Sequence, residues 1–379
     1  MDLPHQDIDP DGLLEFSVVF TDLSLNHMSG RFIGVMQELL EMLRSTYHAA
    51  DVAVIPGGGT YAMEAVARQF ATGRKCLVVR NGFFSYRWSQ IFDVGSIPAE
   101  HIVLTASPVG DGPQSPWAPP PIEEAVAAIR AHRPELVFAA HVETASGILL
   151  PDDYVRALAA ATREVDGLFV LDCIASGALW VDLADLGVDL LISAPQKGWS
   201  GTPCAGYVML GERALAALDA TTSSSFAVNL KQWLAISQGY AAGRTAYHAT
   251  MPTDGLARNA LLMRETVDRG LEQLRAAQIE LGTRVRAVLA ERGFPSVAAD
   301  GFASPTVVVV HTTDPDLKTG AKFAATGIQV AAGVPLMCDE PADFMSFRIG
   351  LFGLDKLGDV DATVARLTAA LDRIGPAAG

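Results

Sequence analysis

The sequence of 379 residues predicts an α/β fold with a mainly parallel β-sheet and a smaller α+β unit at the carboxyl end. Three observations support this prediction. Short apolar runs alternate with amphipathic segments up to about residue 210. Most of these runs end abruptly in polar or glycine-containing turns, as buried parallel strands do. Beyond residue 210 the alternation stops, and a long helical region precedes three further strands.

The first half of the chain supplies the elements of the large sheet. Strands are expected at residues 52–55, 75–80, 101–104, 136–141, 168–171, 188–193 and 207–210. Helices are expected at residues 26–48, 61–70, 83–92, 122–132 and 152–165, where apolar residues recur at helical spacing. Residues 111–121 are rich in proline and are expected to form a loop without an element of its own.

The second half is expected to build a separate small domain. Residues 258–293 read as one long helical region, followed by strands near 306–312, 328–331 and 346–351 and by a closing helix at 355–374. The predicted division is an N-terminal arm at residues 1–25, a large domain at 26–257 and a small domain at 258–379, with 258–293 as a bridging helix.

Composition and charge restrict the class of protein. Half of the residues are hydrophobic and the net charge is −15, which argues against nucleic acid or anionic membranes as partners. No apolar run approaches the ~18 residues of a membrane span. The four cysteines show neither a C-x-x-C pair nor zinc-ligand spacing, so we expect reduced thiols, no metal site and a cytoplasmic protein. The acidic, polar N-terminus does not resemble a signal peptide.

Two residues between positions 168 and 210 suggest chemistry. Asp172 ends one apolar strand, and Lys197 follows the next strand. Side chains just beyond the carboxyl ends of parallel strands share a crevice in open α/β sheets. A carboxylate for a pyridinium nitrogen and a lysine for a Schiff base are what a pyridoxal 5'-phosphate (PLP) site requires. Taken singly, Asp172 also suits a helix cap and Lys197 a surface loop.

Other strand ends carry weaker signals. The turn Gly57-Gly58-Gly59-Thr60 precedes a helix and suits a phosphate, but it lacks the third glycine of a dinucleotide site and the lysine of a P-loop. Phe84 could stack on a cofactor ring or pack in the core. Thr144 could hydrogen-bond a ring hydroxyl or cap a loop. Arg348, inside an apolar strand, suits either a substrate carboxylate or a structural ion pair.

Six motifs in order resemble the class V aminotransferases of PLP fold type I, most closely the alanine–glyoxylate and serine–pyruvate aminotransferase group. They are PGGGTYAMEA, NGFF, HVETASG, LDCIASGALWVD, SAPQKGWSGTP and FRIGLFG, and the resemblance spans about residues 26–374. It implies a seven-stranded-type sheet, PLP as cofactor, and transamination between a small α-amino acid and an α-keto acid such as glyoxylate or pyruvate.

The resemblance also implies roles for individual residues. Lys197 would be the Schiff-base lysine and proton shuttle, Asp172 the partner of the pyridine nitrogen, and Arg348 the residue that binds the substrate carboxylate. The remaining cofactor contacts implied are Gly58, Gly59, Thr60 and Gln196 at the phosphate, and Phe84, Ile174 and Thr144 around the ring. Tyr247 and Thr250 would reach the phosphate in the neighbouring subunit, which implies a homodimer with active sites at the interface.

Two departures leave the substrate pair open. The family often begins with a Gly-Pro-rich stretch, whereas this chain has EFSVVFTD at residues 15–22, and Phe84 replaces the usual tryptophan. A PLP-dependent lyase, acting by β-elimination, desulfuration or decarboxylation, therefore remains the alternative. Gln196 and Phe84 stand where the related desulfurases usually carry histidine, which counts against desulfuration. A nicotinamide-dependent oxidoreductase, a non-catalytic PLP-fold protein and a reactive Cys338 also stay open.

Overall fold

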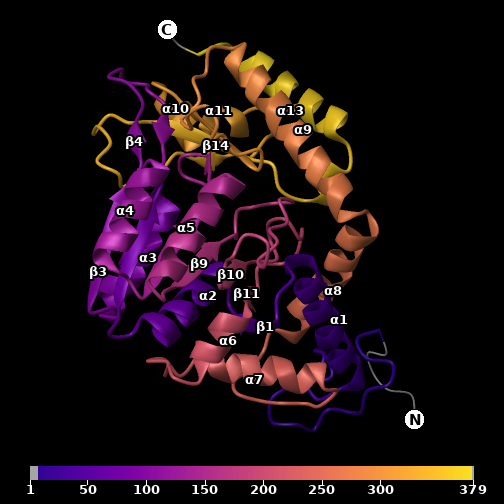
Figure 1. Cartoon of the computed structure of the whole chain (residues 1–379). Helices are drawn as coiled ribbons and strands as arrows, with labels where there is room; N and C mark the ends of the chain where they lie inside the picture. Colours follow the sequence, from indigo (N-terminus) through magenta and orange to yellow (C-terminus); the bar gives the residue numbers. More distant parts are fainter. Residues whose placement is uncertain (1–6, 378–379) are drawn as a thin grey trace.

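A seven-stranded sheet forms the centre of the computed structural model, which describes residues 7–377 (Figure 1). Its strands lie in the order β1-β11-β10-β9-β6-β2-β3. They are β1 (Asp51–Pro56), β2 (Lys75–Arg80), β3 (Glu100–Thr105), β6 (Leu136–Ala140), β9 (Leu168–Asp172), β10 (Leu190–Ser193) and β11 (Ala205–Leu210). All neighbours run parallel except β11, which is antiparallel to both β1 and β10. The predicted mainly parallel sheet is therefore confirmed.

Burial on both faces explains why these strands are apolar throughout. Every residue of β6, β9, β10 and β11 is buried, whereas the edge strand β3 is only partly covered. Helices lie against the sheet along its width and exclude water from both faces. They are α1 (Gly30–Tyr47), α2 (Gly59–Val66), α3 (Phe83–Gly95), α4 (Ile122–His132), α5 (Asp152–Glu164), α6 (Glu212–Leu218) and α7 (Leu230–Ala241).

Two of these helices begin at other residues than apolar spacing suggested. The predicted helix at 26–48 starts only at Gly30, because the Ser29 hydroxyl accepts a hydrogen bond from the Phe32 amide and ends the preceding turn. The helix predicted at 61–70 starts earlier, at Gly59, and its last turn, Ala67–Ala71, widens into a π-helix. The glycine turn therefore leads directly into the first turn of α2.

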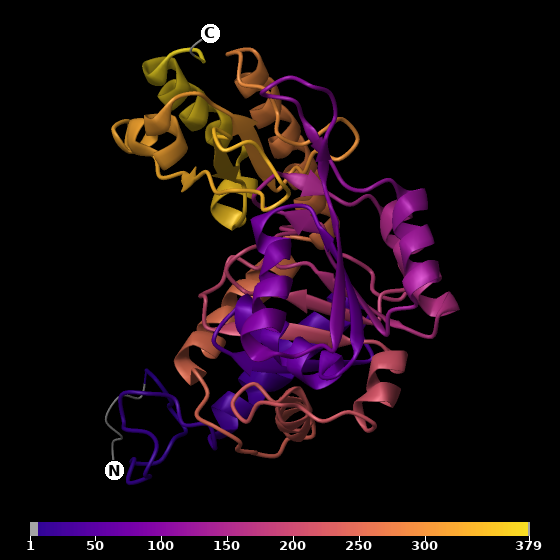
Figure 2. The ribbon, with the colours of Figure 1, turned by 90° about the vertical axis from the view of Figure 1, so that its left-hand side faces the viewer.

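A second, antiparallel sheet of three strands forms the other unit. It contains β12 (Val307–His311), β14 (Ser346–Gly350) and β13 (Ala331–Ala332), in the order β12-β14-β13. The accompanying helices are α9 (Leu271–Ala290), α10 (Pro315–Thr319), α11 (Ala321–Ala324), α12 (Leu354–Leu357) and α13 (Val360–Ile374). The helix α8 (Thr253–Asp268), which precedes α9, packs against α1 of the large sheet's unit. Figure 2 shows this unit at the end of the molecule opposite to the described N-terminal residues. The domain boundaries at 25 and 257 stay predictions, and residues 1–6 of the predicted arm lie outside the described residues.

Four expectations in this region and its surroundings were wrong in detail. The helix expected at 258–293 is divided between α8 and α9 at Gly270, whose φ of +86° no helix allows. The closing helix is divided between α12 and α13, because the Asp359 carboxylate caps the Ala362 amide and begins a new helix. The strand expected at 328–331 reduces to Ala331–Ala332. The 111–121 loop contains β5 (Trp117–Ala118), paired with β4 (Ser107–Pro108).

Close packing of α9 joins it to the segment that precedes β12. A Cβ added to Gly282 would lie 2.3 Å from the Cα atom of Pro305, so only glycine lets the two backbones approach this closely. Gly34, in the exposed part of α1, has nothing within 4 Å of the same position. Within residues 7–377, no helix is both long and apolar enough to cross a membrane.

These two glycines form a matched pair for a test of packing. We expect Gly282→Ala to lower the free energy of unfolding by about 1–3 kcal/mol, because the backbone must shift. Gly34→Ala should raise it by about 0.5–1 kcal/mol, because alanine restricts the unfolded chain in an open helical position. Urea unfolding of the two variants checks this, and equal stability of both would contradict the close contact.

Candidate active site

Asp172 and Lys197 meet at the carboxyl edge of the large sheet. Asp172 is the last residue of β9, and Lys197 lies in the loop that follows β10. These two strands are parallel neighbours, with Ile192 opposite Asp172. Neither side chain forms a hydrogen bond or ion pair with the other, although each charge acts on the other's pKa.

Burial controls the ionisation of Asp172. It raises the pKa of this carboxyl to about 7, and the nearby Glu143 carboxylate acts in the same direction. The Ile174 amide, which donates to Asp172 Oδ1 at 2.9 Å, opposes the increase, as do the charges of Arg87 and Lys197. The carboxylate therefore lacks a full cationic partner within the described chain.

Lys197 experiences the opposite effect. Burial lowers the pKa of its amine, the positive charge of Arg348 lowers it further, and Asp172 partly opposes both. The amine nitrogen lies 4.8 Å from the centroid of the Phe352 ring, just beyond β14. Residues from the ends of strands in both sheets thus lie near this amine. Its lowered pKa favours the neutral form, which is the nucleophilic one.

Arg348, on β14, points toward the ring of Phe84. Its Nε donates to the Ala332 carbonyl at 2.8 Å, and the guanidinium carbon lies 5.4 Å from the centroid of the Phe84 ring. Burial lowers the pKa of Arg348, and the charge of Glu143 opposes this. The Nε bond uses one of five N–H donors, so the two terminal nitrogens remain for a ligand.

Glu143 fixes Phe84, and sequence reasoning did not identify this role. The carboxylate is fully buried and accepts hydrogen bonds from the amides of Phe84 (3.1 Å), Ser85 (2.8 Å) and Ala145 (2.9 Å). The Ser85 hydroxyl adds a fourth bond at 2.6 Å. Glu143 thereby satisfies the free amides at the start of α3 and anchors the Phe84 side chain. Only its position after an apolar strand hinted at a function.

The glycine turn contacts Ile174. A Cβ on Gly59 would lie 2.4 Å from Ile174 Cδ1, so the close approach requires glycine. The first amides of α2, those of Gly59 and Thr60, donate to no residue among 7–377. The Oε1 atom of Gln196 is buried and also has no partner among the described residues. Free amides at a helix N-terminus are typical of an anion site.

Arg87 is a second residue that the sequence did not reveal. It lies one turn after Phe84 on α3, and its Nη1 donates to the Thr60 hydroxyl at 2.9 Å. Its guanidinium carbon lies 5.4 Å from the centroid of the Phe84 ring. An arginine on an amphipathic helix usually faces solvent, so the sequence carried no signal for this contact.

Three predicted residues have no direct contact with this cluster. Thr144 is buried in the turn between β7 (Val142–Glu143) and β8 (Ile148–Leu149), and its hydroxyl has no hydrogen-bond partner among the described residues. Tyr247 and Thr250 are exposed, and their hydroxyls lie 3.4 Å apart. The Tyr247 ring packs 5.4 Å from that of His27. No described contact joins Tyr247 or Thr250 to Lys197, Asp172 or the glycine turn.

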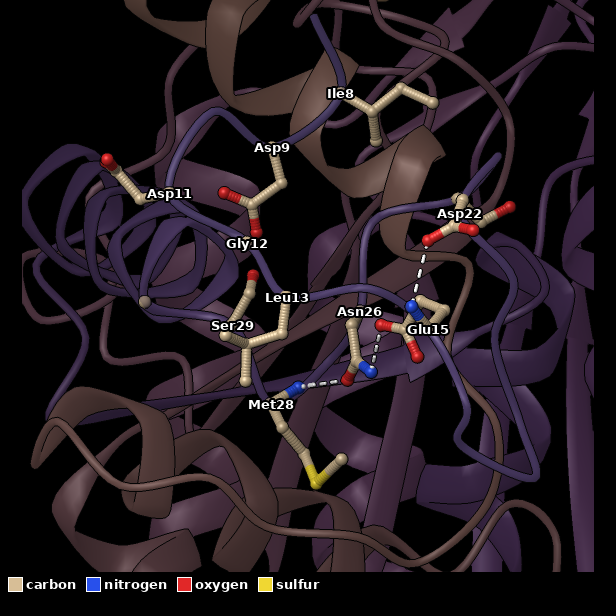
Figure 3. A pocket seen from close by; sticks show the side chains of 12 residues that line it. Ile8, Asp9, Asp11, Gly12, Leu13, Glu15, Asp22, Asn26, Met28 and Ser29 are labelled. Carbon is tan, nitrogen blue, oxygen red and sulfur yellow. Dashed lines mark hydrogen bonds between the residues drawn. The ribbon is translucent and has the colours of Figure 1, made fainter. Parts of the chain in front are cut away.

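Cys338 and the N-terminal cavity lie outside this chemistry. Burial raises the pKa of Cys338 to about 12, so it is a neutral thiol near pH 7. A cavity of about 390 Å³ in the arm is lined by residues 8–30 and contains several acidic side chains (Figure 3). Its polar contacts are internal, such as Asn26 Nδ2 to Glu15 Oε1 at 2.5 Å. No three-residue cluster of His, Cys, Asp or Glu suited to a metal occurs within residues 7–377.

Comparison with known proteins identifies the family. The model of the family described as Aminotransferase class-V matches residues 18–345. The chain belongs to the class V aminotransferases. It is a PLP-dependent aminotransferase, as its sequence motifs implied, and the alternative lyase chemistry is not favoured.

Individual relatives are similar along most of the chain. The soluble hydrogenase small subunit of Synechococcus sp. is 25% identical over 93% of this chain and 88% of the relative. The 2-aminoethylphosphonate–pyruvate transaminase of Burkholderia ambifaria is 28% identical over 84% of this chain and 81% of the relative. The crystal structure of alanine–glyoxylate aminotransferase from Nostoc sp. has a TM-score of 0.77 at 23% identity, covering 92% and 88% of the two chains. That likeness confirms the PLP fold type I architecture.

The geometry suits the cofactor of this family. Asp172 offers a buried carboxylate without a full cationic partner, which suits a protonated pyridine nitrogen. Lys197 offers an amine of lowered pKa on the neighbouring strand end. The unpartnered amides at the start of α2 suit the phosphate, and the space above Gly59 is limited by Ile174. Each charged or polar part of the cofactor thus has a complementary group at this edge.

The raised pKa of Asp172 predicts a dependence of stability on pH. The folded apoprotein holds a proton up to about pH 7, whereas the unfolded carboxyl releases it near pH 3.9. The stabilisation is therefore complete below about pH 4 and is lost as the pH rises through 7. Asp172→Asn stays neutral and avoids this loss. Between about pH 5.5 and 8.5 the wild-type apoprotein should lose about 2 kcal/mol relative to the variant.

Urea unfolding of both apoproteins at the two pH values measures this difference. Asp185→Asn, which alters an exposed carboxylate paired with Arg156, is the control and should follow the wild-type profile. Parallel pH profiles of wild type and Asp172→Asn would contradict the raised pKa.

Proposed function

We propose that this aminotransferase moves an amino group between a small α-amino acid and an α-keto acid such as glyoxylate or pyruvate, with Lys197 as its Schiff-base lysine. The observation that carries the proposal is the buried amine of Lys197 beside Asp172 at the strand ends, its pKa lowered by burial and by Arg348. A lowered pKa increases the neutral fraction of this amine, and a neutral amine can act both as a nucleophile and as a base.

The cofactor contacts follow from the same arrangement. When bound, PLP supplies a protonated ring that takes up the electron pair released at the substrate carbon. Asp172 would hold the proton on the ring nitrogen, because a cation beside the carboxylate offsets the cost of its burial. The other proposed contacts are Gly58, Gly59, Thr60 and Gln196 at the phosphate, and Phe84, Ile174 and Thr144 around the ring.

Arg348 would orient the amino acid. Its Nε is held by the Ala332 carbonyl, which directs the two terminal nitrogens toward the space beside Phe84. A carboxylate binds such a planar fork with two parallel hydrogen bonds. The amine of Lys197 would then take the proton from the substrate α-carbon and give it to the C4′ carbon of the cofactor, a step worth roughly 10²–10⁴-fold in rate.

The relatives support a small keto acid as the acceptor. The Burkholderia relative is named for pyruvate, and the chain matches most of its length. Arg348 explains the requirement for a carboxylate, but it does not distinguish one short side chain from another. The departures at residues 15–22 and at Phe84 alter the surroundings in which such a choice is made.

We also propose a homodimer whose active sites lie at the interface. Tyr247 and Thr250 are exposed side chains with no described contact to their own chain's Lys197, and they would complete the phosphate site of the partner. The neighbouring arm exposes large apolar side chains, including Phe16 and Val18, which monomers rarely leave in a cluster. A cytoplasmic location is consistent with four cysteines that all occur as free thiols.

Substitution of Lys197 tests the central assignment. Borohydride should fix PLP covalently to the wild-type protein at Lys197 and not to Lys197→Ala, because within residues 7–377 no other lysine follows the carboxyl end of a strand of the large sheet. Lys231→Ala, which alters an exposed lysine paired with Asp219, is the control and should be labelled like the wild type. Peptide mapping by mass spectrometry locates the label. Equal labelling of Lys197→Ala would refute the role.

The same preparation distinguishes the reaction type. Adding amino donors to the wild-type PLP form should convert its absorbance to that of the pyridoxamine form without release of ammonia. Release of ammonia with retention of the original spectrum would indicate a lyase. The donor that converts the cofactor fastest identifies the amino acid.

Subunit mixing tests the shared site. We expect Lys197→Ala and the double variant Tyr247→Ala/Thr250→Ala to be nearly inactive alone, since each lacks part of every site. Mixed dimers would contain one intact site and one doubly altered site, so a 1:1 mixture should regain up to about a quarter of wild-type activity. Activity after co-refolding of differently tagged chains measures this. An absence of recovery, with the mixed dimer isolated through both tags, would place both residues in their own subunit's site.

A further inference from the structure

Arg87 is a cation without a carboxylate partner at the glycine turn. Its side chain is half-buried, and it forms no ion pair with any Asp or Glu among residues 7–377. Its described contacts are the Thr60 hydroxyl, at 2.9 Å from Nη1, and the Phe84 ring. Its charge also lowers the pKa of the buried Asp172. Since no carboxylate of the described chain pairs with it, the guanidinium is available to an anion that binds at the glycine turn.

A positive charge beside the glycine turn would strengthen its binding of a phosphate. Its other groups are neutral donors: the amides of Gly59 and Thr60 and the Thr60 hydroxyl. A phosphate monoester carries about −1.5 to −2 charges at pH 7. Neutral donors at a helix start attract an anion, but a guanidinium beside them adds charge-assisted attraction of about twice the strength.

The contact with Thr60 also sets the direction of its hydroxyl. A threonine oxygen has two acceptor lone pairs and one hydrogen to donate. Arg87 Nη1–H fills one lone pair, and arginine cannot accept in return. The Thr60 hydrogen therefore points away from Arg87 and is free to donate to an anion at the start of α2. Arg87 thus prepares Thr60 as a donor before the ligand binds.

We propose that Arg87 is a positioning residue for the phosphate of the cofactor, one that orients the Thr60 hydroxyl and supplies the positive charge of the glycine turn. The inference rests on the proposed cofactor site at Asp172 and Lys197. It assigns the two arginines beside Phe84 to different anions: Arg87 to the cofactor phosphate and Arg348 to the substrate carboxylate.

Comparison of PLP with pyridoxal, which lacks the phosphate, tests this role in the apoprotein. Arg87→Ala should raise the Kd of PLP about 10- to 100-fold, the loss expected when a charge-assisted hydrogen-bond donor is removed. The Kd of pyridoxal should stay within about twofold of wild type, because the ring and aldehyde contacts remain. Arg87→Lys, which keeps the charge but not the planar fork, should give an intermediate Kd for PLP. Absorbance titration measures all these values.

Two further measurements distinguish a specific loss of phosphate binding from a general loss of stability. Arg68→Ala removes an arginine that Glu64 already pairs, at the far end of the helical segment that begins at the glycine turn, so it should leave both Kd values unchanged. Inorganic phosphate should raise the Tm of the wild-type apoprotein and of Arg68→Ala more than that of Arg87→Ala or Arg87→Lys.

Specific results would overturn the inference. An unchanged Kd of PLP in Arg87→Ala would show that the phosphate does not depend on this residue. An equal loss of PLP and pyridoxal in both Arg87 variants would show that Arg87 acts through the Phe84 ring instead. Failure of the wild-type protein to bind either compound would overturn the cofactor site itself, and this inference with it.

Discussion

The parallel pairing of β9 with β10 is the constraint on which the site depends. It places Asp172 opposite Ile192, so the loop that carries Lys197 begins beside the carboxylate, at an edge from which helices and the second sheet exclude most water. Each charge makes the other less costly: Asp172 raises the pKa of Lys197, and Lys197 lowers that of Asp172. Because the two groups do not touch, neither charge is fully compensated. The incomplete compensation favours a cofactor that has a basic ring nitrogen, which Asp172 can hold protonated, and an electrophilic carbon for the Lys197 amine.

Phe84 organises the remaining charges. The buried Glu143 carboxylate holds the start of α3, and thereby fixes the ring of Phe84. Arg87 and Arg348 each lie 5.4 Å from the centroid of that ring, although one belongs to the large sheet's helices and the other to the second sheet. Guanidinium groups favour aromatic faces, so the ring sets the positions of both cations. In this aminotransferase Arg87 therefore lies toward the glycine turn and Arg348 toward the second sheet, and both contact the Phe84 ring.

Some elements could be predicted to the residue, whereas elements interrupted by single turns could not. The strand Lys75–Arg80 and the helix Ile122–His132 have the bounds that their apolar patterns indicated. The helix expected at 258–293 is broken at Gly270, since one residue with positive φ ends a helix whatever the surrounding periodicity. In the site, Asp172 and Lys197 could be predicted together because strand ends of a parallel sheet converge. Glu143 and Arg87 could not, because their partners lie 58 and 27 residues away in the chain.

The sequence by itself determined the order of strands and helices, the mainly parallel sheet, the family and the residues at the strand ends. These follow from local periodicity and from motifs that the chain carries in order. Only the tertiary structure decided how those residues behave. The pKa of Asp172, the lowered pKa of Lys197 and the contact of Arg87 with Thr60 depend on burial and on charges from distant segments. The pKa of a buried group depends on its burial and on the charges around it, and these surroundings exist only in the folded chain.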